Sequence, residues 1–321
     1  MAKTLDERSP APPRGFAAFA PESPIRLRPA GLLEGAAAAA AIEQGRALPL
    51  AGGTLAFGEV EALARTQGGV VSAYGTVADL LAWSAEQWPS VGERVATALA
   101  AIVAPRRPWA GFTLDRPRLM AVLGVGSGDG AAADPADAIE RGRALLAEGA
   151  DIVDVAGARA RPGAAVLSPD EEIRCTEPVV RALAAAGAVV SIDTRHAAVM
   201  RAALAAGARI ISDRTALTGD EESLAVAAES GAQLVLMHMA GEPRVSQAAT
   251  GHDEPALDVL DFFEARIAAC EAAAIPREWL VVDPGIGFGK ADPHTRALLA
   301  RLTLLHATGC AVALGASRKS F

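Results

Sequence analysis

The sequence predicts an α/β fold whose main part is a (β/α)₈ TIM barrel, apparently incomplete at the C-terminus, with a small N-terminal accessory region. Two observations indicate this: short apolar runs alternate with Ala-, Leu-, Glu- and Arg-rich stretches of helical length, and no clear hairpin signal joins consecutive runs. Seven runs are expected to be strands: Leu119–Leu123, Ile152–Val155, Val189–Ile192, Arg209–Ile211, Leu234–Met237, Leu280–Val282 and Ala311–Leu314. A doubly wound open sheet is the second possibility.

The stretches between these strands carry helix start and stop signals. Ser168-Pro-Asp-Glu-Glu172 places a capping residue before proline and acids, which are favoured in the first turn of a helix. Glycine readily adopts the left-handed conformation that ends many helices. Four glycines stand just before an expected strand and are predicted to end a helix there: Gly149, Gly187, Gly207 and Gly231.

The length of the barrel region is short for eight units. A complete (β/α)₈ barrel needs about 250 residues, whereas only roughly 200 residues run from Leu119 to Phe321. The chain stops soon after the seventh expected strand. We therefore expect a fragment of a longer barrel; the other possibility is that the accessory region supplies a strand.

The segment before the barrel divides into two parts. Residues 1–30 are expected to be a disordered, Pro- and Arg-rich tail. Residues 31–115 are expected to form an accessory α+β region and linker, with an Ala-rich helix, short apolar segments and a helix from Ala85 to Val103. Ala104-Pro-Arg-Arg-Pro-Trp109 interrupts regular pairing and is typical of a linker. The barrel domain is then expected over residues 116–321.

The composition excludes several classes of protein. A net charge of -8 argues against a nucleic-acid partner, and 51% hydrophobic residues allow a sizeable core. The N-terminus lacks the apolar core of a signal peptide, and the alanine run Gly35–Ile42 is too short to span a bilayer. Three widely spaced cysteines, Cys175, Cys270 and Cys310, show no metal or disulfide spacing. We expect a cytoplasmic protein with no membrane partner.

Polar residues follow almost every expected strand. They include Asp193-Thr194, Ser212-Asp213, His238, Asp283 and Ser317-Arg-Lys319. In a barrel the carboxyl ends of the strands meet on one face, so these side chains are expected to share a pocket. Aspartates on one side, with Arg161, Arg318 and Lys319 on another, suit a ligand that joins an amino-bearing heterocycle to an anion. Either arginine could instead be a solvated surface residue.

The densest of these segments is Asp283-Pro-Gly-Ile-Gly-Phe-Gly-Lys290. Its glycines allow the backbone to approach a ligand, and Phe288 between them is expected to be an exposed lid over an aromatic substrate. It is not a Walker loop, because residue 284 is proline and Ala291 replaces the required Ser or Thr. The alternate glycines of 124–130 also miss the spacing of a dinucleotide-binding turn.

Several of these residues have a purely structural alternative. Asp193 and Asp283 could cap the helices that follow them. His238, between two methionines, is interpreted as a hydrogen-bonded core residue, and Asp154, within an apolar strand, as the anchor of a neighbouring loop.

Six motifs in this order resemble the dihydropteroate synthase family. They are Gly149-Ala-Asp-Ile-Val-Asp154, Arg161-Pro-Gly-Ala164, Ser191-Ile-Asp-Thr194, Leu236-Met-His-Met239, Asp283–Lys290 and Ser317-Arg-Lys-Ser-Phe321. The resemblance runs from about Leu119 to Phe321, and the region before it looks like the extension that some bacterial members carry. It implies a (β/α)₈ barrel that condenses 6-hydroxymethyl-7,8-dihydropterin diphosphate with 4-aminobenzoate, releasing diphosphate, in folate biosynthesis.

The resemblance also implies roles for individual residues. Lys319 and Arg161 would be catalytic, with Lys319 over the pterin and Arg161 in reach of the diphosphate. The implied substrate-binding residues are Asp193, Ser212, Asp283, Phe288, Lys319, Arg161, Pro162 and Ser320. Asp193 and Asp283 would grip the amino edge of the pterin. The mobile loop of Arg161 and Pro162, with Phe288 and Ser320, would enclose aminobenzoate.

The chain departs from the family pattern where the diphosphate and Mg²⁺ would bind. The resemblance implies Mg²⁺, but Gly124 replaces the asparagine that helps to hold it, so the metal ligands remain unknown. Ser212 replaces a pterin-contacting asparagine, and Ala158-Arg-Ala160 replaces Glu-Ser-Thr, with Arg159 as a possible substitute cation.

Three functions are weighed on this basis. The first is an active, divergent dihydropteroate synthase that acts on these two small molecules, with a homodimer as its expected assembly. The alternative is a non-catalytic pterin-binding paralogue or a partner subunit of an active synthase. The third is a pterin-dependent methyltransferase, which would not need the Ser317-Arg-Lys cluster.

Overall fold

The computed structural model describes residues 15–17, 19, 23–66, 69–126, 134–157, 167–239, 254–290, 292–317 and 319. Two compact units are present. The first comprises residues 1–105 with 303–309, and the second comprises residues 106–302 with 310–321. In the described parts of the chain, no helix is long and apolar enough to cross a membrane.

The first unit is an antiparallel sheet with helices, and its apolar core includes Leu27, Phe57 and Leu80. Its strands are β1 (Arg26–Leu33), β2 (Leu48–Pro49), β3 (Ala56–Thr66) and β4 (Gly69–Thr76). Its helices are α1 (Gly35–Glu43), α2 (Val77–Ala85) and α3 (Pro89–Val103). The expected Ala-rich helix and most of the expected helix from Ala85 to Val103 are therefore present as α1 and α3.

Strand β1 corrects the expected extent of the N-terminal tail. Residues 26–30 were assigned to a disordered segment by composition, yet they pair with β3 from Arg26↔Leu63 onward. Leu27 is only 1% exposed, because this long-range pairing places it in the core of the unit. Among the described residues β1 pairs only with β3, so it is an edge strand, where Pro29 is tolerated.

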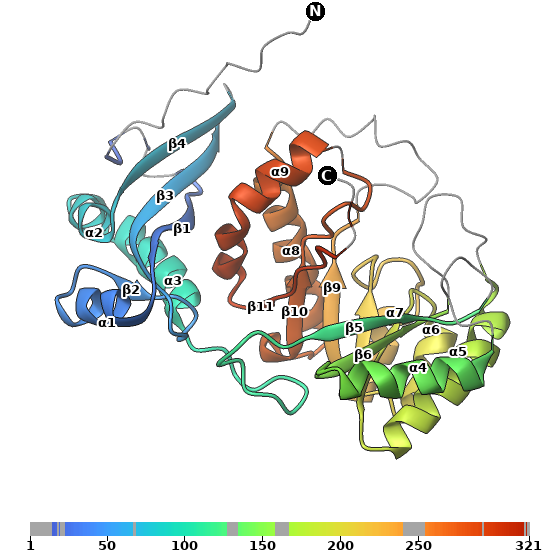
Figure 1. Ribbon diagram of the computed structural model, residues 1–321. Helices are drawn as coiled ribbons and strands as arrows, with labels where there is room; N and C mark the ends of the chain where they lie inside the picture. The colour runs from blue at the N-terminus through green and yellow to red at the C-terminus, as the bar shows by residue number, and fades with distance from the viewer. Residues whose placement is uncertain are drawn as a thin grey trace, which may run out of the picture. The chain divides into compact units, whose positions relative to one another are not determined.

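The second unit contains all seven expected strands. They are β5 (Met120–Gly124), β6 (Ile152–Ala156), β7 (Val189–Asp193), β8 (Ile210–Asp213), β9 (Gln233–Met237), β10 (Leu280–Asp283) and β11 (Ala311–Val312). All neighbouring pairs are parallel, and the strands lie side by side in chain order (Figure 1). A doubly wound sheet reverses its order at a switch point. Unbroken sequential order therefore confirms the barrel architecture, here as a partial barrel.

Helices connect these strands as the capping signals predicted. They are α4 (Pro135–Ala147), α5 (Pro169–Ala185), α6 (Ala197–Ala206), α7 (Ser223–Ser230), α8 (Pro255–Ala272) and α9 (Asp292–Ala300), with short 3₁₀ segments at Arg277–Trp279 and Leu302–Thr308. Ser168 and Glu171 form a reciprocal capping box at the start of α5. Each of the four predicted cap glycines has a positive φ, for example 110° at Gly207.

The amino-terminal end of the strands is closed by a tight turn that begins with Trp109. Trp109 and Phe112 form an isolated bridge, and Trp109 is buried against the first residues of β6 and β8, Ile152 and Ile210. Trp109 Nε1 donates a hydrogen bond to the Trp279 carbonyl at 2.9 Å. The second unit therefore starts at Arg106, before the expected boundary at 116, because the aromatic residues after the linker prolines complete its core.

Candidate active site at the carboxyl ends of the strands

Three aspartates from different strands gather at the carboxyl end of the sheet. Asp193 ends β7, Asp283 ends β10, and Asp154 lies within β6, in register with Ser191 of β7. The pKa of Asp154 is raised to about 7. Burial is the largest cause, and the nearby carboxylates of Asp193 and Asp283 act in the same direction. The expected convergence of Asp193 and Asp283 on one rim is thus present in the structure.

Asp193 is held by an arginine that the sequence did not single out. Arg214, just after β8, donates from Nε to Asp193 Oδ1 at 2.9 Å. The side chains are 23% and 14% exposed, and the attraction of Asp193 is the largest cause of the raised pKa of Arg214. Arg214 follows Ser212 by two residues, so the period of a strand would have placed both on one side.

Ser212 lies beside Asp193, whereas its neighbour Asp213 has a structural role. Ser212 is in register with Asp193, and its carbonyl accepts a hydrogen bond from the Thr194 amide at 3.0 Å. The buried Asp213 carboxylate accepts bonds from the Thr215 amide and hydroxyl and from the Leu217 amide. Burial raises the Asp213 pKa while these bonds oppose the shift, so this carboxylate serves to fix the turn after β8.

Glu172 is a further buried acid near this rim. It comes from the first turn of α5, and burial raises its pKa, while a hydrogen bond with Thr194 opposes the shift. A Cβ at Gly157, just after β6, would overlap the Glu172 side chain, so only glycine lets this acid approach the end of β6. The sequence indicated Glu172 only as an acid that favours a helix start.

Asp283 organises the glycine-rich loop that follows it. Its Oδ1 accepts a hydrogen bond from the Gly285 amide at 2.8 Å. Burial raises its pKa, and that bond together with Lys290 and Lys319 opposes the shift. Gly285 has a φ of 62°, and a Cβ there would overlap the His238 carbonyl oxygen. Glycine is therefore required where this loop crosses the end of β9.

Lys290 stabilises this loop through hydrogen bonds to backbone carbonyl oxygens. The side chain is buried, and Nζ donates to the carbonyl oxygens of His238 at 2.9 Å, Gly285 at 3.1 Å and Phe288 at 3.3 Å. Burial lowers the Lys290 pKa to about 7, with the Asp283 carboxylate opposing. Three acceptors match the three donors of the protonated amine. Lys290 is therefore a structural residue of the loop, a role that the sequence analysis did not assign to it.

Lys319 and Phe288 contact each other. The Lys319 ammonium lies 3.8 Å from the centroid of the Phe288 ring, within range of a cation–π interaction. Burial lowers the Lys319 pKa, and Asp283 opposes the shift. Phe288 was expected to be exposed; it is half-buried, and Lys319 lies against its ring.

His238 and Asp154 have different kinds of surroundings. His238 packs edge-on against Phe262 at 4.8 Å, and its amide bonds to the Asp283 carbonyl, in agreement with its interpretation as a core residue. The Oδ1 of Asp154 and the Oγ of Ser191 are buried, and neither has a hydrogen-bond partner among the residues that the structure describes. Within that part of the chain Asp154 therefore anchors no loop through Oδ1.

Other expected site residues lie outside the described part of the chain. These are Arg161, Pro162 and Ser320, together with Arg159 and Arg318. Gly124, the last residue of β5, offers no side chain to a metal. In the described ranges no group of three or more His, Cys, Asp or Glu side chains is placed to hold a metal ion.

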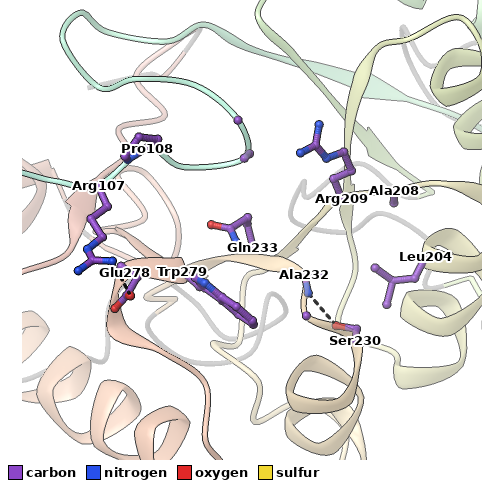
Figure 2. A pocket seen from close by; sticks show the side chains of 13 residues that line it. Arg107, Pro108, Leu204, Ala208, Arg209, Ser230, Ala232, Gln233, Glu278 and Trp279 are labelled. Carbon is purple, nitrogen blue, oxygen red and sulfur yellow. Dashed lines mark hydrogen bonds and ion pairs between the residues drawn. The ribbon is translucent and has the colours of Figure 1, made fainter.

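A separate pocket of about 470 Å³ lies at the opposite end of the strands. Arg209 and Gln233, where β8 and β9 begin, line it together with Trp279 before β10 (Figure 2). Arg107 and Glu278 form an ion pair of 3.7 Å at its edge. None of the aspartates at the carboxyl ends of the strands lines this pocket, so it is distinct from the candidate active site.

Comparison with known proteins identifies the family. A family model described as pterin binding enzyme matches residues 126–321. The dihydropteroate synthase of Escherichia coli K12 is 39% identical over 212 residues, 64% of this chain and 75% of that protein. A probable bifunctional folylpolyglutamate synthase/dihydropteroate synthase of Haloferax volcanii is 44% identical over 57% of this chain, which spans only 22% of that relative.

Solved structures agree with the sequence relatives. Xanthomonas albilineans dihydropteroate synthase with 4-aminobenzoic acid has a TM-score of 0.60 and 39% identity, covering 65% of this chain and 77% of that one. The same enzyme in complex with 7,8-dihydropteroate has a TM-score of 0.56 and 36% identity, covering 65% and 76%. The chain therefore belongs to the pterin-binding enzymes, and within them to the dihydropteroate synthase family.

Proposed function

We propose that the chain acts as a dihydropteroate synthase, a transferase of folate biosynthesis. It would condense 6-hydroxymethyl-7,8-dihydropterin diphosphate with 4-aminobenzoate to give dihydropteroate and diphosphate. The observation that carries this proposal is the convergence of Asp193 and Asp283 on one rim with Lys319 nearby, in a family whose Xanthomonas member is solved with 4-aminobenzoic acid and with 7,8-dihydropteroate.

The pterin would be recognised by the acids of the rim. A carboxylate accepts N–H donors, and the pterin presents an amino group and a ring N–H. Asp193 and Asp283 would accept these bonds, and Ser212 would add a short hydroxyl beside Asp193. Lys319, which lies close enough to Asp283 to affect its pKa, would donate to the ring from the same side.

The reaction is a displacement at carbon. The aminobenzoate nitrogen forms a bond to the methylene carbon as the bond from that carbon to the diphosphate oxygen breaks, and the nitrogen then loses a proton. The departing diphosphate gains negative charge, so cationic groups accelerate this step more than a proton shuttle would. Arg161 would supply that charge, with Lys319 assisting, and Arg161, Pro162, Phe288 and Ser320 would enclose aminobenzoate.

Magnesium does not fit the described residues. Gly124 has no ligating side chain, and no cluster of metal ligands is found in the part of the chain that the structure describes. The Mg²⁺ requirement that the family resemblance implies is tested by adding Mg²⁺ or a chelator to the assay. A cytoplasmic location and a homodimer likewise remain predictions.

The test is formation of dihydropteroate from both substrates, followed by chromatography, with diphosphate release measured in parallel. We expect product only when both substrates are present, and a loss of about tenfold or more for Asp283→Asn, because a carboxylate–pterin bond is removed. Arg201→Gln is a suitable control, since this arginine pairs on the surface with Glu222. No product from the purified chain would rule out synthase activity.

The second candidate is a non-catalytic pterin-binding protein. The replacement of metal- and diphosphate-binding positions by Gly124 and Ala158-Arg-Ala160 favours it. Titration calorimetry with 6-hydroxymethylpterin separates the two functions: binding without turnover supports this candidate, and absence of binding rejects both. A methyl-transfer assay with a methylated folate and a corrinoid acceptor checks the remaining methyltransferase possibility.

A further inference from the structure

The pocket at the amino ends of the strands has the size of a small-molecule site. Its volume is about 470 Å³, and such sites usually have roughly 300–1,000 Å³. All of its lining residues belong to the second compact unit. Residues at this face of a barrel usually serve stability, as the buried Trp109 does here. Three side chains that line the pocket do not fit that role.

These three side chains come from the starts of neighbouring strands. Arg209 directly precedes β8, Gln233 is the first residue of β9, and Trp279 directly precedes β10. Gln233 is in register with Ile210 of β8, and its amide donates a hydrogen bond to the Arg209 carbonyl at 3.1 Å. On its other side β9 pairs with β10. The three residues therefore lie on adjacent strands, and all of them line the pocket (Figure 2).

The polar groups of these side chains are not used by the fold. In the part of the chain that the structure describes, the Arg209 guanidinium, the Gln233 amide group and Trp279 Nε1 make no hydrogen bond or ion pair with another residue. Arg209 is exposed and extends over the turn at Gly111, whereas Gln233 and Trp279 are half-buried. A charged fork of donors, an amide and an aromatic N–H are thus available to a ligand.

The charges of the pocket favour a ligand with one negative charge. Arg107 is paired with Glu278 at 3.7 Å, so Arg209 is the cation that the charged lining residues leave unbalanced. Helices α6 and α7 both end here, where Ala208 and Ser230 line the pocket. The C-terminal end of a helix carries partial negative charge, which disfavours a polyanion such as a phosphate ester. A single carboxylate matches the planar fork of arginine.

Trp279 adds a preference for a flat ring. Its backbone is fixed, because its carbonyl accepts a hydrogen bond from Trp109 Nε1 at 2.9 Å and its amide donates to the Pro276 carbonyl at 3.0 Å. The half-buried indole lies beside Gly231, with Cη2 at 3.9 Å from the position that a Cβ would occupy there. An indole held in this way offers its face to an aromatic ligand.

We propose that this pocket binds a planar aromatic monocarboxylate. The carboxylate pairs with the Arg209 guanidinium, the ring packs against the Trp279 indole, and the Gln233 amide bonds to a polar substituent of the ring. This site is separate from the aspartates at the carboxyl ends of the strands, so the inference does not depend on the proposed synthase function.

The test uses 2-naphthoate and its neutral analogue 2-naphthamide, each titrated into the full chain by calorimetry. We expect the native chain to bind the carboxylate about tenfold or more tightly than the amide. Arg209→Gln should remove this preference by weakening the carboxylate alone, whereas Arg201→Gln, which changes an exposed arginine of α6, should keep it. Trp279→Leu should weaken both probes, because it removes the ring that both contact. A ratio of two affinities is insensitive to a general loss of folded protein.

The indole N–H signals locate the bound probe, since the chain has four tryptophans. In protein with isotope-labelled indole nitrogens, 2-naphthoate should shift the Trp279 signal, which is assigned by its absence in Trp279→Leu. The signals of Trp83 and Trp88, which belong to the first unit, should stay unchanged.

Several results would overturn the inference. They are equal binding of the two probes or binding of neither, an unchanged preference in Arg209→Gln, and displacement of 2-naphthoate by an equal concentration of inorganic phosphate. Weakening of 2-naphthoate by Asp283→Asn in place of Arg209→Gln would also overturn it, because the probe would then occupy the candidate active site.

Discussion

Burial raises the pKa of individual acids at the rim, and Asp154 is the clearest example. Its pKa is raised from 3.8 to about 7, first by burial and then by Asp193. Between these values the folded chain keeps a proton that the unfolded chain has released. The contribution to stability is therefore fully present below pH 3.8 and is lost as pH rises through about 7.

Asp154→Asn should remove this dependence, since the amide has the same shape and does not titrate. Between pH 5 and 7 the free energy of unfolding of the native chain should fall, relative to the variant, by about 1.4 kcal/mol per pH unit. Urea unfolding at several pH values measures this difference. If the free energy of unfolding depended on pH in the same way for both proteins, Asp154 would not be the group that keeps a proton in the folded chain.

Lys290 should contribute to stability through its three carbonyl partners. Replacement by methionine keeps most of the apolar stem but leaves the carbonyls of His238, Gly285 and Phe288 without this donor. The expected loss is about 1–3 kcal/mol in the free energy of unfolding. Thermal unfolding of Lys290→Met measures it, with the exposed cation variant Arg107→Met as control. Equal midpoints of thermal unfolding for Lys290→Met and Arg107→Met would contradict the structural role of Lys290.

The location of a site residue can be predicted from sequence when the residue directly follows a strand, because the end of that strand alone then sets its position. Asp193 and Asp283 follow directly from their strands, so their convergence could be predicted from the barrel. Arg214, Glu172 and Lys290 acquire their roles from contacts with other elements: β7, the end of β6 and the end of β9. Such contacts depend on packing, which no local pattern encodes.

At the scale of elements, the loop after β10 is defined by backbone geometry that only glycine allows. Gly285 combines a φ of 62° with close approach to the His238 carbonyl. Gly285→Ala should therefore displace the loop, with a loss of pterin binding of about tenfold or more if the loop carries that site. Calorimetry with 6-hydroxymethylpterin measures this loss.

Gly149→Ala is the matched control for this substitution. Gly149 also has a positive φ, 107°, but no atom lies within 4 Å of its built Cβ. An alanine at Gly149 would therefore have the same unfavourable positive φ as one at Gly285, but no steric overlap. Gly149 follows α4 and is remote in sequence from the loop after β10. If both variants bound pterin equally, the overlap at Gly285 would have no functional consequence.

Among the elements, the parallel strands were more predictable than the antiparallel ones. Strands β5 to β11 are apolar runs bounded by glycines and helices, a pattern that parallel sheets impose. Strands β1 and β4 were not predicted, because Pro29 and the arginines near it, and the small residues of β4, resemble coil. Their pairing with β3 supplies the stabilisation that their own sequences lack.

On the scale of the whole barrel unit, the two ends of the strands have separate roles. The carboxyl ends hold the acids of the candidate site, whereas the amino ends are closed by Trp109 and its apolar neighbours. This division is general for the fold, where residues at the amino-terminal face serve stability. Trp109 is the last residue of an expected linker, so its contribution to the core of the unit was visible only in the structure.

Trp109→Ala should accordingly destabilise the barrel unit without touching the candidate site. Trp109 is 5% exposed, and its loss removes a large buried ring and the bond from Nε1 to the Trp279 carbonyl. We expect about 3–5 kcal/mol of destabilisation, whereas Trp109→Phe, which keeps most of the ring area, should cost less. Hydrogen exchange of amides in β6 and β8 reports on this unit directly. Trp88→Ala is the control, because that side chain is 73% exposed; similar protection in Trp109→Ala and Trp88→Ala would show that the turn does not close the barrel.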